Sequence, residues 1–492
     1  MGKEIMIRDL IFSYGGNGNQ LEHISLDIAA GEVIVMTGPS GSGKSSLTRV
    51  INGLIPYFYE GELSGDVFVD GKPLKEIPSW ERGKIVGNVF QDPRSQFFAN
   101  EVAGEVAFGC ENYGYSHEEI RNHVHRAAAD IKIQDILDHS LHSLSYGMRQ
   151  KVAIASAEAI DPEMYVIDEP SANLDIASTY RFADIICDLK QQGKTIIIAE
   201  HRLYYLMDLA DRFLCVQKGK IVREFTAQQM KALSNEEIRV LGLRTPDLHQ
   251  IEQAEIPSAA TSEVVLEVKK LNHSFGETIV AKDVDFQCRK GEVVALIGPN
   301  GTGKSTIGRI LAGLLKEKSG EVVLFGKHCR PKGRLGKVWY IPQDLDSQLF
   351  GEDLLDELTT GAEVNPERKQ AAEEILEALE LTPFIKQHPS TLSGGQKQRL
   401  ALGVALMHEA PIIVLDEPTS GLDGTNMRNV SRMIRKLAKM GRTIIVITHD
   451  AECALACCER AIRLENGCIT DDFQIRGAEL LLDKIGYDKK EG

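Results

Sequence analysis

Two segments of the chain, Gly38–Ser45 (GPSGSGKS) and Gly298–Ser305 (GPNGTGKS), have the residue types and spacing that bind nucleotide phosphates. In the pattern G-x-x-x-x-G-K-[ST], glycines let backbone N–H groups turn toward the β-phosphate. The lysine reaches the β- and γ-phosphate oxygens, and the Ser or Thr hydroxyl binds Mg²⁺. We therefore expect two ATP sites with Mg²⁺ on one polypeptide. The expected contacts in and directly after these loops are Gly38, Ser40, Gly41, Gly43, Lys44, Ser45, Ser46, Gly298, Asn300, Gly301, Gly303, Lys304, Ser305 and Thr306.

The segments around each loop support this interpretation. Each loop follows an apolar run, residues 33–37 and 293–297, that is typical of a buried strand. Each also precedes a helical pattern, residues 46–54 and 306–315. A Gly-rich turn that matched the pattern by accident would not have this context twice.

An acidic pair follows an apolar strand pattern in each half of the chain. The pairs are Asp168-Glu169 and Asp416-Glu417. An aspartate at the carboxyl end of a strand can hold Mg²⁺, and the adjacent glutamate can polarise a water molecule against the γ-phosphate. A strand that simply ended in a solvated acidic turn would not account for the phosphate loop upstream.

The motifs recur in the same order in both halves. Short apolar strands alternate with helix-like segments such as residues 117–139 and 366–387, which indicates an α/β fold with a parallel sheet flanked by helices. Residues 228–243 have a helical pattern, whereas the next residues have Pro, Ala, Ser and Thr without periodicity. We predict a first domain over 1–243, a linker over 244–262, a second domain over 263–475 and a tail over 476–492.

The composition limits the possible partners. A net charge of −15 without a dense Lys/Arg block disfavours nonspecific nucleic-acid binding. The nine cysteines lack paired C-x-x-C spacing and fit buried thiols in a reducing cytoplasm. The chain starts in a strand pattern rather than a signal peptide, and no apolar run approaches the roughly 18 residues of a membrane span. We expect any membrane role to be peripheral.

The second half contains Leu392-Ser393-Gly394-Gly395-Gln396, which resembles the signature segment of ABC-type ATPases. The resemblance covers nearly the whole chain. It implies two tandem domains, each with a mostly parallel sheet, an antiparallel β subdomain and a helical subdomain. It also implies that the domains face each other head to tail, as a pseudo-dimer within one chain. Each ATP then lies between one domain's phosphate loop and the other's signature segment, where a helix N-terminus suits the γ-phosphate.

The resemblance implies roles for residues outside the phosphate loops. Tyr14 and Phe275 are expected to stack on adenine, and Asp175 and Asp423 to lie in loops that couple the two sites. The implied catalytic residues are Glu169, His201, Glu417 and His449. The implied Mg²⁺ ligands are Ser45, Gln91, Asp168, Ser305, Gln343 and Asp416. The implied signature contacts to ATP are Ser145, Gly147, Ser393, Gly394, Gly395 and Gln396.

The first signature segment, Leu144–Met148, departs from the family pattern. Tyr146 stands where glycine is expected, and Met148 stands where glutamine is expected. The ring is expected to crowd a position where glycine permits close approach of a phosphate. Under the head-to-tail rule this segment serves the second phosphate loop, so we expect the second site to be the weaker one. The alternative is that Tyr146 is tolerated and the two sites are equal.

The segments that begin at the loop glutamines narrow the family. Gln91–Phe98 (QDPRSQFF) and Gln343–Phe350 (QDLDSQLF) share a pattern, and Glu101–Gly109 (EVAGEVAFG) follows the first. They resemble ATPase subunits of energy-coupling factor importers, which take up vitamins and transition-metal ions. The resemblance implies a transmembrane coupling protein and a small substrate-binding membrane protein as partners, at the cytoplasmic face of the membrane. For the cargo we expect a vitamin or vitamin precursor first, and cobalt or nickel second.

Other classes fit less well. The fused ATPase of a conventional sugar importer usually lacks intact catalytic residues in its second half, where Glu417 and His449 stand here. A soluble ABC protein that acts on ribosomes should have a long basic linker and lack the switch histidines, whereas residues 244–262 are short and mildly acidic. A non-catalytic scaffold would not need both glutamates.

Overall fold

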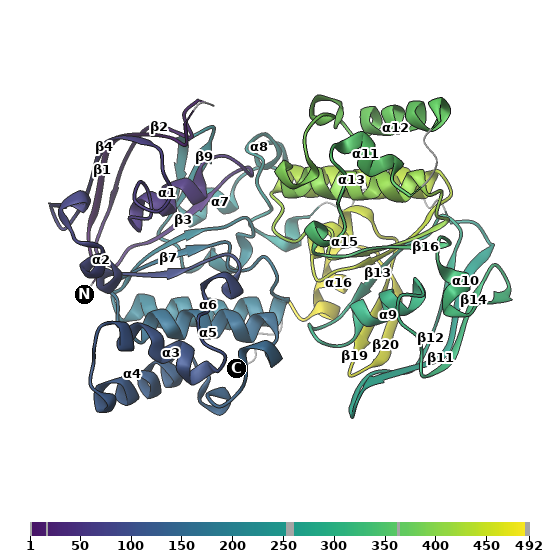
Figure 1. Ribbon diagram of the computed structural model, residues 1–492, viewed down its shortest axis with the longest axis horizontal. Helices are drawn as coiled ribbons and strands as arrows, with labels where there is room; N and C mark the ends of the chain where they lie inside the picture. The colour runs from purple at the N-terminus through teal and green to yellow at the C-terminus, as the bar shows by residue number, and fades with distance from the viewer. Residues whose placement is uncertain (1, 16–17, 252–259, 362–364, 488–492) are drawn as a thin grey trace. The chain divides into compact units, whose positions relative to one another are not determined.

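The computed structural model describes residues 2–15, 18–251, 260–361 and 365–487 (Figure 1). The chain forms two compact units, Met1–Asp247 together with Asp423–Thr425, and Leu248–Leu422 together with Asn426–Gly492. Each unit has the expected α/β architecture, with a larger mixed sheet and a smaller antiparallel sheet. The division after residue 247 falls inside the predicted linker 244–262, of which residues 252–259 lie outside the described part of the chain.

The larger sheet of the first unit has the strand order β10-β9-β3-β8-β7-β6. Its strands are β3 (Val33–Thr37), β6 (Val86–Val89), β7 (Met164–Asp168), β8 (Thr195–Ala199), β9 (Arg212–Gln217) and β10 (Lys220–Phe225). Neighbouring strands run parallel from β6 to β9, and β10 runs antiparallel to β9. Every residue of β3 and β8 is buried, as expected for parallel strands covered on both faces.

This strand order brings four sequence motifs to one edge of the sheet. The strands β3, β8, β7 and β6 are neighbours in that order, and parallel neighbours end at the same edge. They lead into the phosphate loop, His201, the Asp168-Glu169 pair and Gln91. Residues that are far apart in the sequence therefore meet at the carboxyl ends of these strands.

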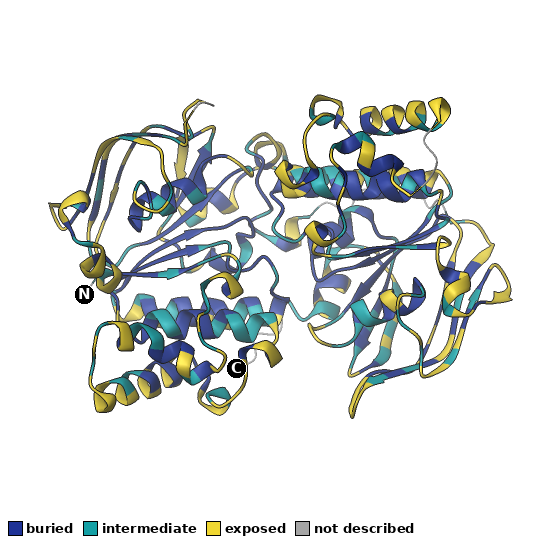
Figure 2. Ribbon diagram, viewed as in Figure 1, coloured by how far each residue is buried: buried dark blue, intermediate teal, exposed yellow. Residues whose placement is uncertain are grey.

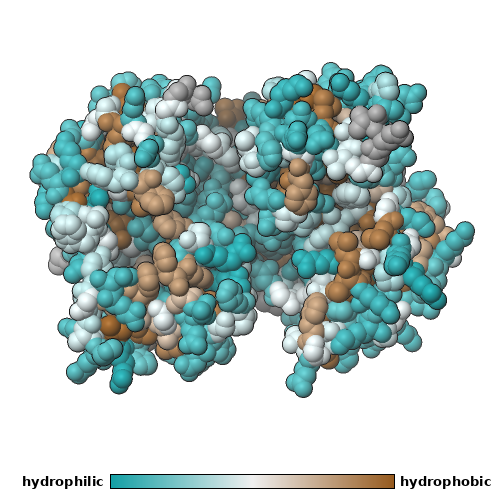
Figure 3. All heavy atoms as spheres, in the orientation of Figure 1, coloured by the Kyte–Doolittle hydropathy of each residue, from teal (hydrophilic) through white to brown (hydrophobic). Residues whose placement is uncertain are grey.

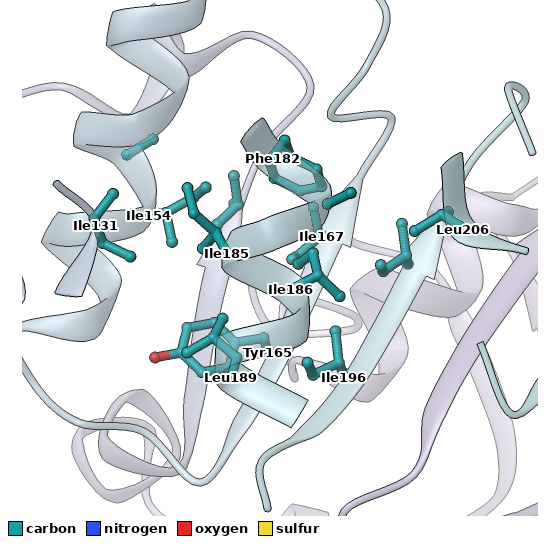
Figure 4. Packing of buried hydrophobic residues seen from close by; sticks show 14 of the residues in the cluster. Ile131, Ile154, Tyr165, Ile167, Phe182, Ile185, Ile186, Leu189, Ile196 and Leu206 are labelled. Atoms are coloured by element: carbon teal, nitrogen blue, oxygen red, sulfur yellow. The ribbon is translucent and has the colours of Figure 1, made fainter. Parts of the chain in front are cut away.

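The first unit also contains α-helices. They are α1 (Lys44–Ile51), α2 (Ser79–Ile85), α3 (Val102–Asn112), α4 (His117–Asp130), α5 (Tyr146–Glu158), α6 (Ile176–Gln191), α7 (Ala227–Lys231) and α8 (Asn235–Val240). In α6, Phe182, Ile185, Ile186 and Leu189 recur at helical spacing and belong to the same core as Tyr165 of β7 (Figure 4). This apolar face holds α6 against the strand that carries the acidic pair.

The smaller sheet of the first unit has the order β2-β1-β4-β5 and is antiparallel. Its strands are β1 (Ile5–Ser13), β2 (Leu21–Ile28), β4 (Glu62–Val69) and β5 (Lys72–Pro73). Inward residues of β1 share a core with Ile34 and Met36 of β3 and with Leu47 of α1. The expected antiparallel subdomain therefore packs beside the phosphate loop.

The second unit repeats this plan. Its larger sheet has the order β16-β17-β18-β13-β19-β20, and its smaller sheet has the order β12-β11-β14-β15. Its strands are β11 (Val264–Phe275), β12 (Thr278–Arg289), β13 (Val293–Ile297), β14 (Ser319–Leu324), β15 (Lys327–His328), β16 (Val338–Ile341), β17 (Ile412–Asp416), β18 (Thr443–Ile447), β19 (Arg460–Glu465) and β20 (Cys468–Gln474). Its helices are α9 (Lys304–Leu311), α10 (Pro331–Arg334), α11 (Leu354–Thr359), α12 (Pro366–Ala378), α13 (Gly394–Met407), α14 (Gly424–Lys439), α15 (Ala451–Cys457) and α16 (Ala478–Ile485).

Some helix limits differ from the sequence-based expectation. The helices after the phosphate loops begin at Lys44 and Lys304, two residues earlier than predicted, because Gly43 and Gly303 turn the chain with positive φ directly before them. The predicted helix over residues 228–243 is instead the two short helices α7 and α8. The capping boxes at Thr226 and Ser234 each begin a new helix, which explains the interruption.

Burial within each unit follows this architecture. Buried residues form the larger sheets and the helix faces against them, while exposed residues lie on loops and outer helix faces (Figure 2). Hydrophilic side chains dominate the face seen in Figure 3, and apolar groups form separate patches on it. None of the helices in the described ranges has the length and apolar character needed to cross a membrane.

Candidate nucleotide-binding sites

The first phosphate loop joins β3 to α1. Gly38 has a φ of 139°, and a Cβ atom there would lie 2.1 Å from the carbonyl oxygen of Val216, so only glycine fits. Lys44 is buried, and its Nζ donates to the carbonyl oxygens of Gly38 (2.9 Å) and Pro39 (3.0 Å). Burial lowers the pKa of Lys44, while the nearby Glu169 carboxylate opposes this shift. The lysine thus points into its own loop, where the pattern predicts the phosphates.

Asp168 lies beside this loop at the end of β7. Ser45 Oγ donates to Asp168 Oδ1 at 3.3 Å. Burial, together with the adjacent Glu169 carboxylate, raises the pKa of Asp168 to about 6. A hydroxyl beside a half-buried carboxylate is an oxygen-donor set of the kind that binds Mg²⁺. These residues therefore fit a divalent cation, whose charge would compensate the cost of burying the carboxylate.

Glu169 occupies a strained backbone position, with a φ of 43°. Such a conformation costs on the order of 1–3 kcal/mol and is concentrated at functional sites. Glu169 Oε2 accepts a hydrogen bond from Gln91 Nε2 at 2.7 Å, and Oε1 lies 3.2 Å from His201 Nε2. Burial acts to raise the pKa of Glu169, but His201 and Lys44 together lower it below its ordinary value. The ionised carboxylate thus lies between the Gln91 and His201 side chains, both of which were predicted as site residues from the sequence.

The second site has the same backbone arrangement. Lys304 is buried, and its Nζ donates to the carbonyl oxygens of Gly298 and Pro299, both at 2.8 Å. Glu417 has a φ of 48°, and its Oε1 lies 2.8 Å from His449 Nδ1. The neighbouring strands β13, β18, β17 and β16 end beside the loop, His449, the acidic pair and Gln343.

The aspartate of the second site has a partner that its counterpart does not share. Tyr340 Oη donates to Asp416 Oδ2 at 2.5 Å. Burial raises the pKa of Asp416, and the hydrogen bonds from Tyr340 and Ser305 oppose that shift. At the equivalent place on β6 stands Asn88, which accepts a hydrogen bond from Asn52 at 2.8 Å. No motif marks Tyr340, so the sequence analysis missed it.

The two aromatic residues expected to stack on adenine are exposed. Tyr14 Oη accepts from Arg49 Nη1 at 3.1 Å and lies 3.3 Å from Ser46 Oγ, so this ring lies beside α1. Phe275 ends β11 and meets the His273 ring edge-on, with ring centroids 4.9 Å apart. Since neither ring is part of a core, each has a face on which a base could stack.

The signature segments begin helices with different caps. Ser393 Oγ accepts from the N–H of Gln396 at 3.4 Å, and Gln396 Oε1 accepts from the N–H of Ser393 at 2.8 Å. Ser145 Oγ accepts from the N–H of Met148 at 3.4 Å. Because the Met148 side chain has no oxygen, the second bond of the capping box is lost at the start of α5.

Tyr146 is directed toward the glutamine loop of its own unit. Its Oη donates to the carbonyl oxygen of Gln91 at 2.5 Å, and burial raises its pKa to about 12. At the equivalent Gly394 a Cβ atom would lie 3.5 Å from Leu422, which is ordinary contact, so the start of this helix tolerates a side chain. The sequence analysis did not foresee this hydrogen bond. The predicted crowding of a phosphate by Tyr146 stays a prediction.

Each glutamine loop ends in an exposed phenylalanine held by a buried carboxylate. Glu105 Oε2 accepts from the N–H groups of Phe98 and of the next residue, at 2.8 and 2.9 Å. Glu357 Oε2 accepts from the N–H groups of Phe350 and of the next residue, at 2.7 and 2.6 Å. Phe98 and Phe350 are 73% and 75% exposed, whereas both glutamates are buried. The same local structure therefore presents an aromatic ring to solvent in both units.

A buried polar network behind His201 was also missed by the sequence analysis. Glu200 Oε1 accepts from the N–H groups of His201 (2.6 Å) and Arg202 (3.1 Å), and Tyr205 Oη donates to Glu200 Oε2 at 2.7 Å. Arg202 Nη1 donates to the carbonyl oxygen of Ser171 at 3.3 Å, which ties the histidine loop to the loop after β7. Its sign in the sequence is a charged residue on each side of His201.

The structure thus gathers most of the predicted residues of each site within one unit. In the first unit the phosphate loop, Asp168, Glu169, His201 and Gln91 lie at one sheet edge. Asp175 caps α6 by accepting from the N–H of Ser178 at 2.8 Å. It stays a prediction that Asp175 and Asp423 couple the two sites. It also stays a prediction that each signature segment contacts the ATP bound by the phosphate loop of the other half.

Comparison with known proteins agrees with this geometry. The family model described as ABC transporter matches residues 21–172 and 281–420, more than half of the chain. The chain is 38% identical over 479 residues to an ABC transporter ATP-binding protein of Treponema denticola, covering 96% of this chain and 98% of that protein. It is 32% identical over 477 residues to YkoD of Bacillus subtilis, named for HMP/thiamine import, covering 91% and 87%.

Several solved structures match along nearly the whole chain. One of them is a model of ribosome-bound archaeal Pelota and ABCE1, with a TM-score of 0.70 over 97% of this chain and 81% of that chain. The two sequences are 24% identical, so this likeness shows the fold alone.

Proposed function

This chain belongs to the ABC transporter family of ATP-binding proteins, and from that premise we propose that it is the ATPase of an energy-coupling factor importer. In this proposal it acts at the cytoplasmic face of the membrane as a peripheral subunit. Its partners are a transmembrane coupling protein and a small substrate-binding membrane protein. The name of the Bacillus subtilis relative favours a vitamin or vitamin precursor as cargo.

The proposed chemistry assigns one role to each group at the sheet edge. Lys44 and Lys304 bind the β- and γ-phosphates, and Tyr14 and Phe275 stack on adenine. Glu169 and Glu417 polarise the attacking water, with His201 and His449 beside them. Mg²⁺, when bound, neutralises charge on the phosphates. Its proposed ligands are Ser45, Gln91, Asp168, Ser305, Gln343 and Asp416.

We also propose that the two sites are unequal. In a head-to-tail pairing, the first phosphate loop meets Ser393, Gly394, Gly395 and Gln396, a segment with a complete capping box. The second loop meets Ser145, Gly147 and the altered positions Tyr146 and Met148. The missing second bond of the capping box and the added ring both weaken the second site, so the first site carries most hydrolysis.

The observation that carries the importer proposal is the exposed phenylalanine at the end of each glutamine loop. Phe98 and Phe350 are among the most exposed large apolar side chains in the described ranges. Glu105 and Glu357 fix the backbone of each ring, so the exposure is built into the loop. Burying two aromatic rings against a partner favours association, and apolar helices of a membrane protein offer a matching surface.

The experiment is to purify the chain from its own membranes in mild detergent and to identify the proteins that accompany it by mass spectrometry. We expect a coupling membrane protein and a small, very apolar partner, whose identity points to the cargo. Recovery with a conventional permease pair, or with ribosomes, would overturn the proposal and leave the ATP chemistry intact.

Two variants sharpen this experiment. Phe98→Ala with Phe350→Ala removes the rings, and we expect the membrane partners to be lost while ATP binding is kept. Val240→Ala, at an exposed position on α8, is the matched control and should leave the partners in place. If the phenylalanine variant keeps its partners, the loops do not form the docking surface.

A further inference from the structure

The helix that begins at the signature segment, α5 in the first unit and α13 in the second, is the signature helix of its unit. In each unit this helix bonds to the glutamine loop, by a hydrogen bond in the first unit and by an ion pair in the second. We define the first glutamine loop as Gln91–Phe98 and the second as Gln343–Phe350. In the first unit, Tyr146 Oη of α5 donates to the Gln91 carbonyl oxygen at 2.5 Å. In the second unit, Lys397 Nζ of α13 lies 2.5 Å from Asp346 Oδ1. Both links connect the first turn of the signature helix to the glutamine loop.

Neither link can form in the other unit. Gly394 replaces Tyr146 in the second unit, so the hydroxyl is absent there. The counterparts of Lys397 and Asp346 in the first unit are Arg149 and Arg94, two cations that cannot pair.

The first-unit arginines have other partners of their own. Arg149 donates to the carbonyl oxygens of Leu141 and His142, at 3.1 and 3.0 Å. Arg94 pairs with Asp92 of its own loop at 3.1 Å. The first unit therefore has a neutral hydrogen bond where the second unit has an ion pair.

A second position changes together with Tyr146. Asn173, in the loop after β7, hydrogen-bonds to the Tyr146 side chain, and the equivalent residue of the second unit is Gly421. The first unit thus has a tyrosine and an asparagine where the second has two glycines. The tyrosine hydroxyl thereby meets the glutamine loop and the loop that follows the acidic pair.

The two links respond differently to salt. The Tyr146 bond joins a neutral hydroxyl to a neutral carbonyl, so screening by dissolved ions has little effect on it. The ion pair is open on one side, because the Asp346 side chain is 70% exposed while that of Lys397 is 16% exposed. Exposed ion pairs weaken as salt screens their charges.

We propose that Tyr146 and the Lys397–Asp346 pair are positioning residues that transmit movement of each glutamine loop to the signature helix of the same unit. The link of the first unit works at any ionic strength, whereas the link of the second unit weakens as salt rises. The functional meaning rests on the proposed roles of the glutamine loops and signature segments. The links themselves lie within single units and can be measured without a membrane partner.

The experiment follows hydrogen–deuterium exchange in the full chain for peptides that cover the two glutamine loops. Wild type, Tyr146→Phe and Lys397→Met are compared at about 0.1 M and about 1 M KCl, between which the Debye length falls from about 10 Å to about 3 Å. We expect Tyr146→Phe to speed exchange in the first loop about fivefold at both salt concentrations, the effect of one lost hydrogen bond. At the lower salt concentration, Lys397→Met should exchange faster in the second loop than wild type does. At the higher concentration the two should exchange at the same rate, because salt has already weakened the ion pair in wild type.

A rescue separates a positioning role from a general loss of stability. Lys397→Arg keeps the charge and should restore slow exchange in the second loop, and each variant should leave the loop of the other unit unchanged. The thermal midpoint of each variant reports whether the unit has loosened as a whole. The proposal is overturned if Tyr146→Phe leaves the first loop unchanged, if both loops respond to either variant, or if salt speeds exchange in both loops alike. These outcomes do not depend on which membrane proteins accompany the chain.

Discussion

Glu169 and Glu417 occupy the same left-handed backbone position, with φ of 43° and 48°, but each carboxylate lies beside a different nitrogen of its histidine ring. Glu169 accepts from Gln91 Nε2 at 2.7 Å and lies near Nε2 of its histidine. Glu417 lies 2.8 Å from Nδ1 of His449, the other ring nitrogen. The backbone of the two sites is thus the same, while the histidine nitrogen that faces the acid differs.

The neighbouring aspartates show the same contrast. Asp168 is bonded to Ser45 and its pKa is raised to about 6, whereas Asp416 also accepts from Tyr340. Strand order and glycines such as Gly38 fix where each acid lies, and a residue outside the motifs, Tyr340, adds a partner at only one of the two aspartates. Two sites with the same motifs therefore need not be chemically equal.

The largest expected effect concerns the two glutamates. If the first site carries most hydrolysis, Glu169→Gln lowers kcat by about 100-fold or more, because general-base catalysis contributes that much. Glu417→Gln should lower kcat by less than about tenfold. The measurement is phosphate release by the purified chain at saturating Mg·ATP, with ATP binding measured as a control. Equal losses in the two variants would remove the proposed inequality.

The shared backbone predicts equal effects at the two loop glycines. Gly38→Ala and Gly298→Ala each place a Cβ atom 2.1 Å from a backbone carbonyl oxygen. Each should lower the free energy of unfolding by about 3 kcal/mol or more and abolish ATP binding in its own unit. Gly41→Ala, with no atom within 4 Å of the new Cβ, should cost about 1–2 kcal/mol for its positive φ. Urea unfolding measures these free energies. A large difference between the effects of Gly38→Ala and Gly298→Ala would contradict a shared backbone structure in the two loops.

The sequence predicted the architecture and the loop residues because these depend on backbone geometry. Glycines at Gly38 and Gly298, buried apolar strands and an acidic pair after β7 and β17 leave few other folds for the chain. It did not predict the partners that distinguish the sites. Tyr340 and Arg202 belong to no motif, and their contacts depend on how neighbouring strands and loops meet in space.

Tyr146 shows the limit most clearly. The sequence identified it as an exception to a glycine, but could not show that its ring reaches the Gln91 carbonyl 55 residues earlier. The head-to-tail pairing of signature segments and phosphate loops still rests on resemblance to the family.

The raised pKa of Asp168 predicts an increase in stability when its charge is removed. Since its pKa rises from 3.8 to about 6 on folding, the folded protein binds this proton more tightly than the unfolded chain does. That stabilisation is full below pH 4 and is lost as pH rises through about 6. At pH 7, Asp168→Asn should therefore stabilise the protein in EDTA by about 2–3 kcal/mol.

The check is thermal unfolding in EDTA and with Mg·ATP. Asp168→Asn should raise the midpoint in EDTA and lose much of the gain that Mg·ATP gives to wild type. Asp416→Asn should raise it less, because Tyr340 already stabilises that carboxylate. A lower midpoint for Asp168→Asn in EDTA would show that the carboxylate stabilises the nucleotide-free fold.

The smallest expected effect is at Tyr340. Tyr340→Phe removes a hydrogen bond to Asp416, which raises the pKa of that carboxylate further and weakens its hold on Mg²⁺. In a Lys44→Ala background, the Mg²⁺ concentration needed for binding of a fluorescent ATP analogue should rise about three- to tenfold. The same change in a Lys304→Ala background should have no effect, and an effect there would mean that Tyr340 acts beyond its own site.

The most direct test of the unequal sites counts the phosphates released in one turnover of the wild-type chain. Both sites are first filled with labelled ATP in EDTA. The protein is then mixed rapidly with Mg²⁺ and an excess of unlabelled ATP, so that only phosphate from the prebound ATP is counted. We expect one fast phosphate per chain, followed by a second that is released much more slowly. Two phosphates released at the same rate would contradict this expectation and show that the altered signature segment serves ATP hydrolysis as well as the complete one.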